Sequence, residues 1–168
     1  MSTPYWALSI IYWLHMLATV IWIGGLAALA LLVLPAARSA LEAPLYARLL
    51  EAVQRRLDPL GWLCLAVLVG TGLFQMSANP NYQGFLTVGN RWAAAILIKH
   101  IVFLVMTAAS AYMTWGLLPA LRREALRAAH GLGVKAIGRL QRRQRALLTL
   151  NLVLGLLVLL LTALARAA

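Results

Sequence analysis

No Asp, Glu, Lys or Arg interrupts residues 5–34, which read YWALSIIYWLHMLATVIWIGGLAALALLVL. About 20 apolar residues are enough to cross the hydrocarbon core of a bilayer as an α-helix. The stretch therefore predicts a membrane span with room for tilt or for a protruding turn. It has no basic residues before it and is about twice as long as the apolar core of a signal peptide. We therefore expect the span to be retained rather than cleaved.

Three further apolar runs follow, at residues 59–77, 92–118 and 146–165. Hydrophobic residues make up 63% of the 168 residues and charged residues only 11%, whereas a soluble domain is about half apolar and about a quarter charged. This composition excludes an ordinary water-soluble globule and a disordered chain. We predict an all-α fold, with one integral membrane domain over residues 1–168 that forms a four-helix bundle.

The basic residues are distributed unevenly between the connections. The segment 35–58 carries four arginines and the segment 119–145 carries eight basic residues, whereas only Arg91 borders the connection between the second and third spans. Short loops rich in Lys and Arg stay in the cytoplasm. The pattern predicts an up-down-up-down topology in a bacterial inner membrane, with 35–58 and 119–145 as cytoplasmic loops and both termini on the periplasmic side.

The net charge of +11 has the same explanation. In a soluble protein it would suggest nucleic acid, but here the basic residues flank apolar runs. We expect contact with anionic lipid head groups and no nucleic-acid binding.

Apolar residues also recur every four positions within the first basic segment, which is helical spacing. The segment is therefore either an interfacial helix or an extension of the spans. Residues 121–146 behave similarly, with a break at Gly131 and Gly133. The recurring residues of the first segment are Leu41, Leu45, Leu49, Val53 and Leu57.

Small residues inside the spans predict close helix packing, because they let two backbones approach each other. Gly24 and Gly25 lie in the first span, and Gly70 and Gly72 lie in the second.

Three ionisable residues lie inside the predicted spans: His15, Lys99 and His100. Ionisable groups in a membrane are costly, so they are functional candidates by default. The first and third spans enter from the same side, with His15 ten residues after Tyr5 and His100 nine residues after Arg91. At a rise of about 1.5 Å per residue, these groups are expected at one level, roughly 14 Å along their helices.

The leading hypothesis for these residues is a b-type haem held between the first and third helices. His15 and His100 would be the axial metal ligands, because alternate helices of such a bundle lie diagonally opposite and leave room for a flat macrocycle. Trp22 and Phe103 would flank the porphyrin. Lys99 would pair with a propionate or would itself be the second axial ligand.

Two other interpretations stay open at this point. In the first, the histidines are structural, each hydrogen-bonded to a neighbouring backbone or hydroxyl group. In the second, they bind copper, which accepts imidazole and soft sulfur ligands. The sulfur candidates are Met16, Met76, Met106 and the single cysteine Cys64.

The sequence offers little for hydrolysis or phosphoryl transfer. All four acidic residues (Glu42, Glu51, Asp58 and Glu124) fall in the predicted cytoplasmic loops, and the chain has no phosphate-cradling glycine loop. If the protein is an enzyme, we expect a haem-dependent oxidoreductase.

Several short motifs lie along the chain: Trp13-Leu14-His15, Trp22-Ile23-Gly24-Gly25, Leu34-Pro35, Gly70-Thr71-Gly72, Arg91, Lys99 and Pro119. Over nearly the whole chain, these motifs resemble the CopD-like (copper resistance protein D) membrane domain family. The resemblance implies copper uptake from the periplasm across the inner membrane. The layout also resembles, more weakly, HemJ-type protoporphyrinogen oxidases, which implies haem b binding at His15 and Lys99.

The combined prediction is a CopD-like protein that binds haem b and transfers electrons, with a quinone or another membrane redox partner. The alternatives are copper binding or transport, a HemJ-like oxidase, and a cofactor-free subunit of a membrane complex.

Overall fold

The computed structural model describes residues 4–82, 84, 88–129 and 134–167, and nearly all of them are helical. Within these residues, four helices are long and apolar enough to cross a membrane, as the sequence predicts. The all-α fold class is therefore confirmed. In chain order, the helical elements are α1 (Tyr5–Ala27), η1 (Ala28–Val33), α2 (Leu34–Ala40), α3 (Ala43–Ser77), α4 (Arg91–Ala111), η2 (Tyr112–Leu117), α5 (Leu118–Ala129) and α6 (Val134–Ala167).

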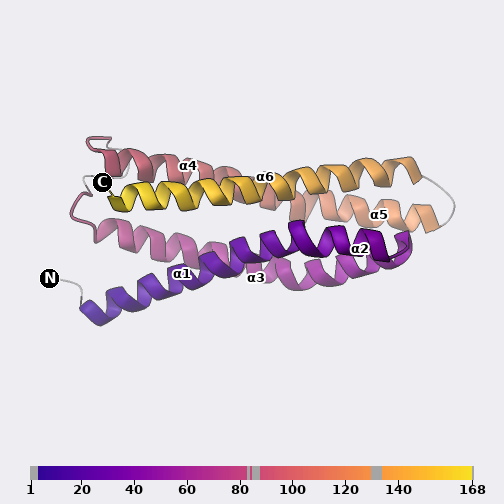
Figure 1. Cartoon of the computed structure of the whole chain (residues 1–168), viewed down its shortest axis with the longest axis horizontal. Helices are drawn as coiled ribbons and strands as arrows, with labels where there is room; N and C mark the ends of the chain where they lie inside the picture. Colours follow the sequence, from indigo (N-terminus) through magenta and orange to yellow (C-terminus); the bar gives the residue numbers. More distant parts are fainter. Residues whose placement is uncertain (1–3, 83, 85–87, 130–133, 168) are drawn as a thin grey trace.

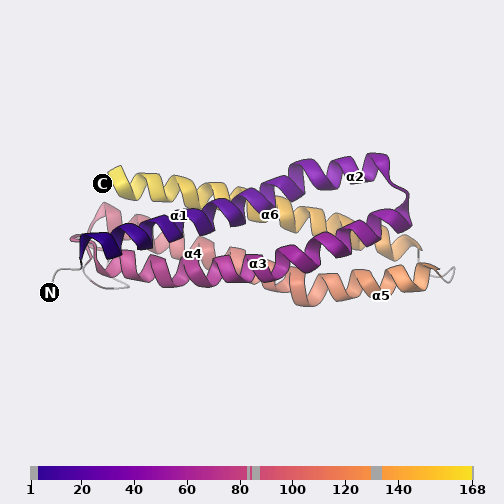
Figure 2. The ribbon, with the colours of Figure 1, turned by 90° about the horizontal axis from the view of Figure 1, so that it is seen from below.

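The long helices lie side by side in an elongated bundle (Figures 1 and 2). α1 packs mainly along α3, and α4 packs mainly along α6, so the bundle consists of two helix pairs. Both chain termini lie at one end, which we call the terminal end (Figure 1). We call the opposite end, formed by α2, α5 and the first turns of α3 and α6, the arginine-rich end. Its arginines include Arg38, Arg48, Arg122, Arg123, Arg127, Arg139, Arg142 and Arg143.

The segments predicted as cytoplasmic loops are mostly helical. α3 is continuous over 35 residues and α6 over 34 residues, which corresponds to about 50 Å each. The hydrocarbon core of a bilayer is only about 30 Å thick. Of the two interpretations of residues 41–57, the structure supports an extension of the spans. Residues 130–133 of the second predicted loop lie outside the described residues.

Two π-helical turns, η1 and η2, occupy matching positions in the two helix pairs. Each turn ends one residue before a Leu-Pro step, at Leu34-Pro35 and Leu118-Pro119. Proline lacks a backbone N–H, and its ring collides with the carbonyl four residues earlier in a regular α-helix. A π turn inserts an extra residue and shifts the hydrogen bonds to the fifth residue back. Accordingly, the Leu34 N–H donates to the Leu29 carbonyl, and the Leu118 N–H donates to the Met113 carbonyl.

The interior forms three apolar layers along the bundle axis. The terminal layer includes Met76 and Trp92, and the middle layer includes Trp22 and Met106. The third layer, around Leu117, fills the arginine-rich end. Because the core continues into this end, the helix extensions pack against one another there and are not isolated helices.

The glycines that contact another helix are not all the ones predicted from sequence. A Cβ atom added at Gly24, Gly25 or Gly70 would meet nothing within 4 Å, so these positions do not bring helices together. A Cβ at Gly155 of α6 would meet Met106 Cε and Ile23 Cγ1 at 3.5 Å. The close approach therefore depends on Gly155, which lets α6 pack against α4 and α1.

We expect Gly155→Leu to destabilise the bundle, because only the Cβ has space and the rest of the side chain would push Met106 and Ile23 apart. Overpacking of this kind costs about 1–3 kcal/mol. The measurement is the thermal unfolding midpoint in detergent. Gly24→Leu, at an exposed position with open space around it, is the matched control. Equal midpoints for the two variants would contradict this packing.

Candidate functional site

His15 is held by a chain of hydrogen bonds that runs from α1 into α3. His15 Nδ1 lies 2.8 Å from Thr71 Oγ1, and the Thr71 hydroxyl donates to the Val67 carbonyl at 2.6 Å. Since that hydroxyl proton is already committed, Thr71 Oγ1 accepts and His15 Nδ1–H donates. In the neutral imidazole, the lone pair then resides on Nε2. An imidazole held through one nitrogen, with the other free, is the arrangement typical of metal-ligating histidines.

The local sequence around His15 allows this arrangement inside lipid. The Thr19 hydroxyl donates to the His15 carbonyl at 2.7 Å, so it is satisfied within its own helix. Gly72, next to Thr71, leaves space for the ring, because a Cβ there would lie 3.5 Å from His15 Cε1. The sequence Gly70-Thr71-Gly72 thus supplies both the acceptor and the clearance for His15.

Lys99 lies on α4, which belongs to the other helix pair from His15. Lys99, Val102 and Met106 are spaced three and four residues apart, so they share one face of the helix. Val102 and Met106 are buried in the middle layer, so Lys99 lies on the same side of α4 as this layer. No Asp or Glu occurs between residues 59 and 123. This stretch, which contains Thr71 and Lys99, therefore offers no carboxylate.

His100 bonds to its own helix. His100 Nδ1 lies 2.7 Å from the Ile96 carbonyl, and a carbonyl can only accept, so Nδ1–H donates and Nε2 carries the lone pair of the neutral ring. His100 is about 100° around the helix from Lys99. Lys99, rather than His100, shares the core-facing stripe of Val102 and Met106.

Trp22 and Phe103 contact each other across the bundle. Their ring centroids are 5.9 Å apart in an edge-to-face arrangement. Trp22 is buried in the middle layer, and Phe103 packs against that layer. The two rings therefore fill the interior between α1 and α4.

The sulfur atoms considered as copper ligands are dispersed. Met16 is 67% exposed on the outer surface, whereas Cys64 and Met106 are buried in the middle layer and Met76 in the terminal layer. Among the described residues, no three His, Cys, Asp or Glu side chains gather as a metal-binding group.

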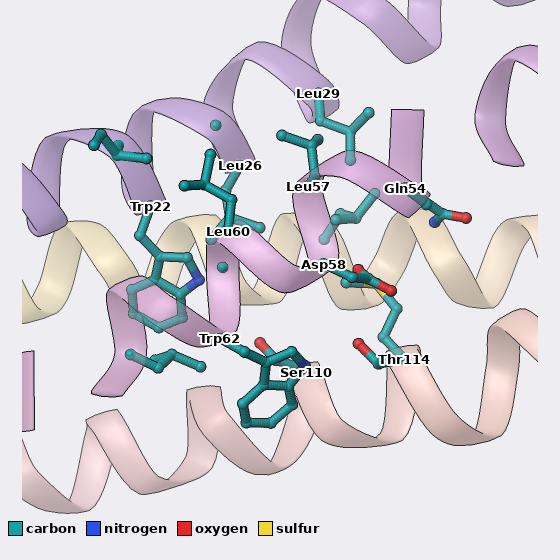
Figure 3. Close-up of a pocket in the computed structure, with 16 residues that line it drawn as sticks. Trp22, Leu26, Leu29, Gln54, Leu57, Asp58, Leu60, Trp62, Ser110 and Thr114 are labelled. Carbon is teal, nitrogen blue, oxygen red and sulfur yellow. The ribbon is translucent and has the colours of Figure 1, made fainter. Parts of the chain in front are cut away.

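A small cavity lies on the arginine-rich side of the middle layer, where sequence reasoning expected nothing. Its volume is about 80 Å³, and α1, α3, α4, η2 and α6 all contribute to its mostly apolar lining. Figure 3 shows Asp58 and Thr114 facing each other in it, with Gln54 and Ser110 nearby. None of His15, Lys99 and His100 lines this cavity. Asp58 was assigned to a loop, whereas it lies inside α3, directly before Pro59.

The sequence model of one protein family, described as CopD, copper resistance protein D, matches residues 51–165, which is more than half of the chain. This chain belongs to the CopD family. With its four membrane-crossing helices, it is a multi-pass membrane protein of a copper-resistance-related family. No curated protein and no solved structure matches it. The matched range begins at residue 51, after α1. It therefore includes Asp58, Thr71 and Lys99 but not His15, whose assignment depends on the geometry alone.

We expect Thr71→Val to change the proton position on His15, because the variant keeps the shape of the side chain but removes the acceptor of Nδ1–H. Nitrogen-15 NMR of histidine-labelled protein should show the Nδ1–H tautomer for His15 in the wild type and a mixture in the variant. Thr107→Val is the control, since the Thr107 hydroxyl bonds only the Phe103 carbonyl. An Nε2–H tautomer in the wild type would refute the hydrogen-bond assignment.

Proposed function

We propose that this CopD-family protein binds copper in the half of the membrane nearer the terminal end, with His15 Nε2 as its first protein ligand. The observation that carries the proposal is the chain from His15 through Thr71 to Val67, which leaves Nε2 with a lone pair. Imidazole is a suitable ligand for copper. The family match supports copper as the metal.

The position of Lys99 supports a transient site rather than a storage site. We expect Lys99 at the level of His15, where its positive charge would oppose a second cation. No Asp or Glu between residues 59 and 123 offsets that charge. An ion that crosses a membrane must bind strongly enough to enter and weakly enough to leave. Copper is therefore the cargo of the proposed site, and Lys99 is the group that keeps its affinity low.

Haem b was the leading hypothesis from sequence, and the arrangement of the aromatic rings does not fit it. Trp22 and Phe103, which were expected to flank a porphyrin, pack against each other. The histidines do have the right tautomers for axial ligands, so haem b stays a second hypothesis. The haem hypothesis includes an electron-transfer role with a quinone or another membrane redox partner, and a HemJ-like oxidase activity.

We expect His15→Ala to lose copper and Lys99→Met to bind it more tightly. The first change removes the ligand, and the second removes the opposing charge. The measurement is copper per protein by mass spectrometry of the metal, with Cu(I) affinity from competition with a chelator. Thr71→Val should weaken binding by roughly 10-fold, as loss of a partner that orients a metal ligand commonly does.

Met16→Leu is the control, because Met16 is adjacent to His15 but faces outward. Unchanged copper binding in His15→Ala would overturn the proposal. A visible spectrum of the same preparation tests the haem hypothesis. A Soret band that His15→Ala abolishes, in protein without bound copper, would show that the ligand is haem b and not copper. A colourless, metal-free protein that purifies with partner chains would support a cofactor-free subunit instead.

We also propose that the arginine-rich end faces the cytoplasm of a bacterial inner membrane, with both termini in the periplasm. Four arginines line one cleft between α5 and α6 there: Arg123, Arg127, Arg139 and Arg143. Positive-inside orientation and anionic lipid head groups both favour this placement. The exposed Trp115 lies 24 residues after Arg91, about 36 Å along the helix, and would anchor the cytoplasmic interface.

Fusions at the C-terminus test this orientation. Alkaline phosphatase folds only in the periplasm, because it needs disulfides, so we expect its fusion after Ala168 to be active. A fusion truncated after Ala129, at the arginine-rich end, should be inactive. The reverse pattern would contradict the proposed topology.

A further inference from the structure

The cavity has a mostly apolar lining in which four polar side chains stack along two helices. Gln54 and Asp58 are one turn apart on α3, and Ser110 and Thr114 are one turn apart on α4 and η2. Asp58 and Thr114 face each other in the cavity (Figure 3). This places four oxygen-bearing side chains around one space.

Two polar side chains at or beside this cavity are buried. The Gln54 side chain lines the cavity and is 7% exposed. Asn151 is 0% exposed; its Nδ2 donates to Oγ of the lining residue Ser110, and its Oδ1 has no partner among the described residues. A buried polar group without a partner costs about 1–3 kcal/mol. Polar groups placed so deep in the bundle favour a polar occupant of the cavity.

The π turn η2 adds a backbone oxygen at the same place. The Leu118 N–H donates to the Met113 carbonyl, so it is not available to the Thr114 carbonyl. The next residue that could donate to Thr114 is Pro119, which has no N–H. The Thr114 carbonyl is therefore left without a helical donor. Unwound or distorted helix segments supply carbonyl oxygens of this kind to cation sites in membrane transporters.

The charge of the lining favours a monovalent cation. Asp58 is the only ionisable side chain among the lining residues, and none of the recorded salt bridges involves it. One carboxylate balances one positive charge, whereas a divalent ion would leave an uncompensated charge in the bundle. The donors are oxygens apart from the Met113 thioether, and oxygen ligands suit hard cations rather than copper.

We propose that this cavity is a second ion site, in which Asp58, with Thr114, Ser110 and Gln54, binds one alkali cation, Na⁺ or K⁺. The site lies about 22 Å along α4 from Lys99, counted from Thr114, and shares no residue with the copper proposal at His15. Its occupant would neutralise Asp58. The two proposals therefore stand or fall separately.

Thermal unfolding of the full chain in detergent tests the site. At constant ionic strength, NaCl or KCl should raise the unfolding midpoint above that in N-methyl-D-glucamine chloride, whose cation is too large to enter, because a ligand that binds only the folded state stabilises it. The comparison of the two salts identifies the ion. Asp58→Asn should abolish the difference, and Thr114→Val should reduce it severalfold. Glu51→Gln, at an exposed salt bridge on the same helix, should retain it.

A second measurement needs no variant. Dicyclohexylcarbodiimide modifies carboxyl groups in apolar surroundings, so mass spectrometry should find it on Asp58 of the wild type, with labelling reduced severalfold by the stabilising alkali cation. His15→Ala should behave like the wild type in both assays. Equal midpoints in all three salts, a salt effect that survives Asp58→Asn, or protection by copper alone would each overturn the proposal.

Discussion

Every polar group that this chain places inside lipid has to find its hydrogen-bond partner within the protein, because the hydrocarbon offers none. Four threonine hydroxyls meet this constraint by donating to the carbonyl four residues earlier: Thr19, Thr71, Thr107 and Thr162. Both intramembrane histidines meet it through Nδ1, His15 on Thr71 and His100 on Ile96. The same constraint that stabilises the helices therefore sets both rings in the tautomer that leaves Nε2 unprotonated. The chemistry available to the protein is in this sense a consequence of how its polar groups are satisfied.

The spans follow from sequence, because apolar run length is nearly independent of tertiary contacts. The helix count and the all-α class are of this kind. The helix extensions were only half predicted: the leucine spacing of residues 41–57 indicated a helix but not that it would continue through Pro59. The hydrogen bond between His15 and Thr71 could not be predicted from the sequence, because it depends on the rotation of α3 about its axis. For the same reason, the sequence could not distinguish a direct contact between Trp22 and Phe103 from an arrangement in which the two rings flank a cofactor.

The two π turns show how a local sequence conflict produces a site far from it in sequence. Pro35 and Pro119 both interrupt helices that must continue into the arginine-rich end. Each is accommodated by one extra residue in the preceding turn, and the second turn leaves the Thr114 carbonyl without a donor. Asp58 approaches that position from α3, where Pro59 follows it. Irregular backbone at this depth is tolerated only where it is buried in protein or lines a polar space. The cavity is the feature that makes this combination of prolines acceptable.

The middle layer separates the two polar regions. His15 and Lys99 lie on its terminal side, and Asp58 and Thr114 lie on the other, with Trp22, Phe103 and Met106 between them. Met106 is 0% exposed, so its neighbours enclose it completely. A hydrophobic layer of this kind blocks ions because a bare charge loses its hydration there. For the ion proposed at His15, this layer would have to open before the ion could reach the arginine-rich end. Fewer contacts join the helix pairs α1–α3 and α4–α6 to each other than join the helices within each pair, so the interface between the pairs has the least packing to lose.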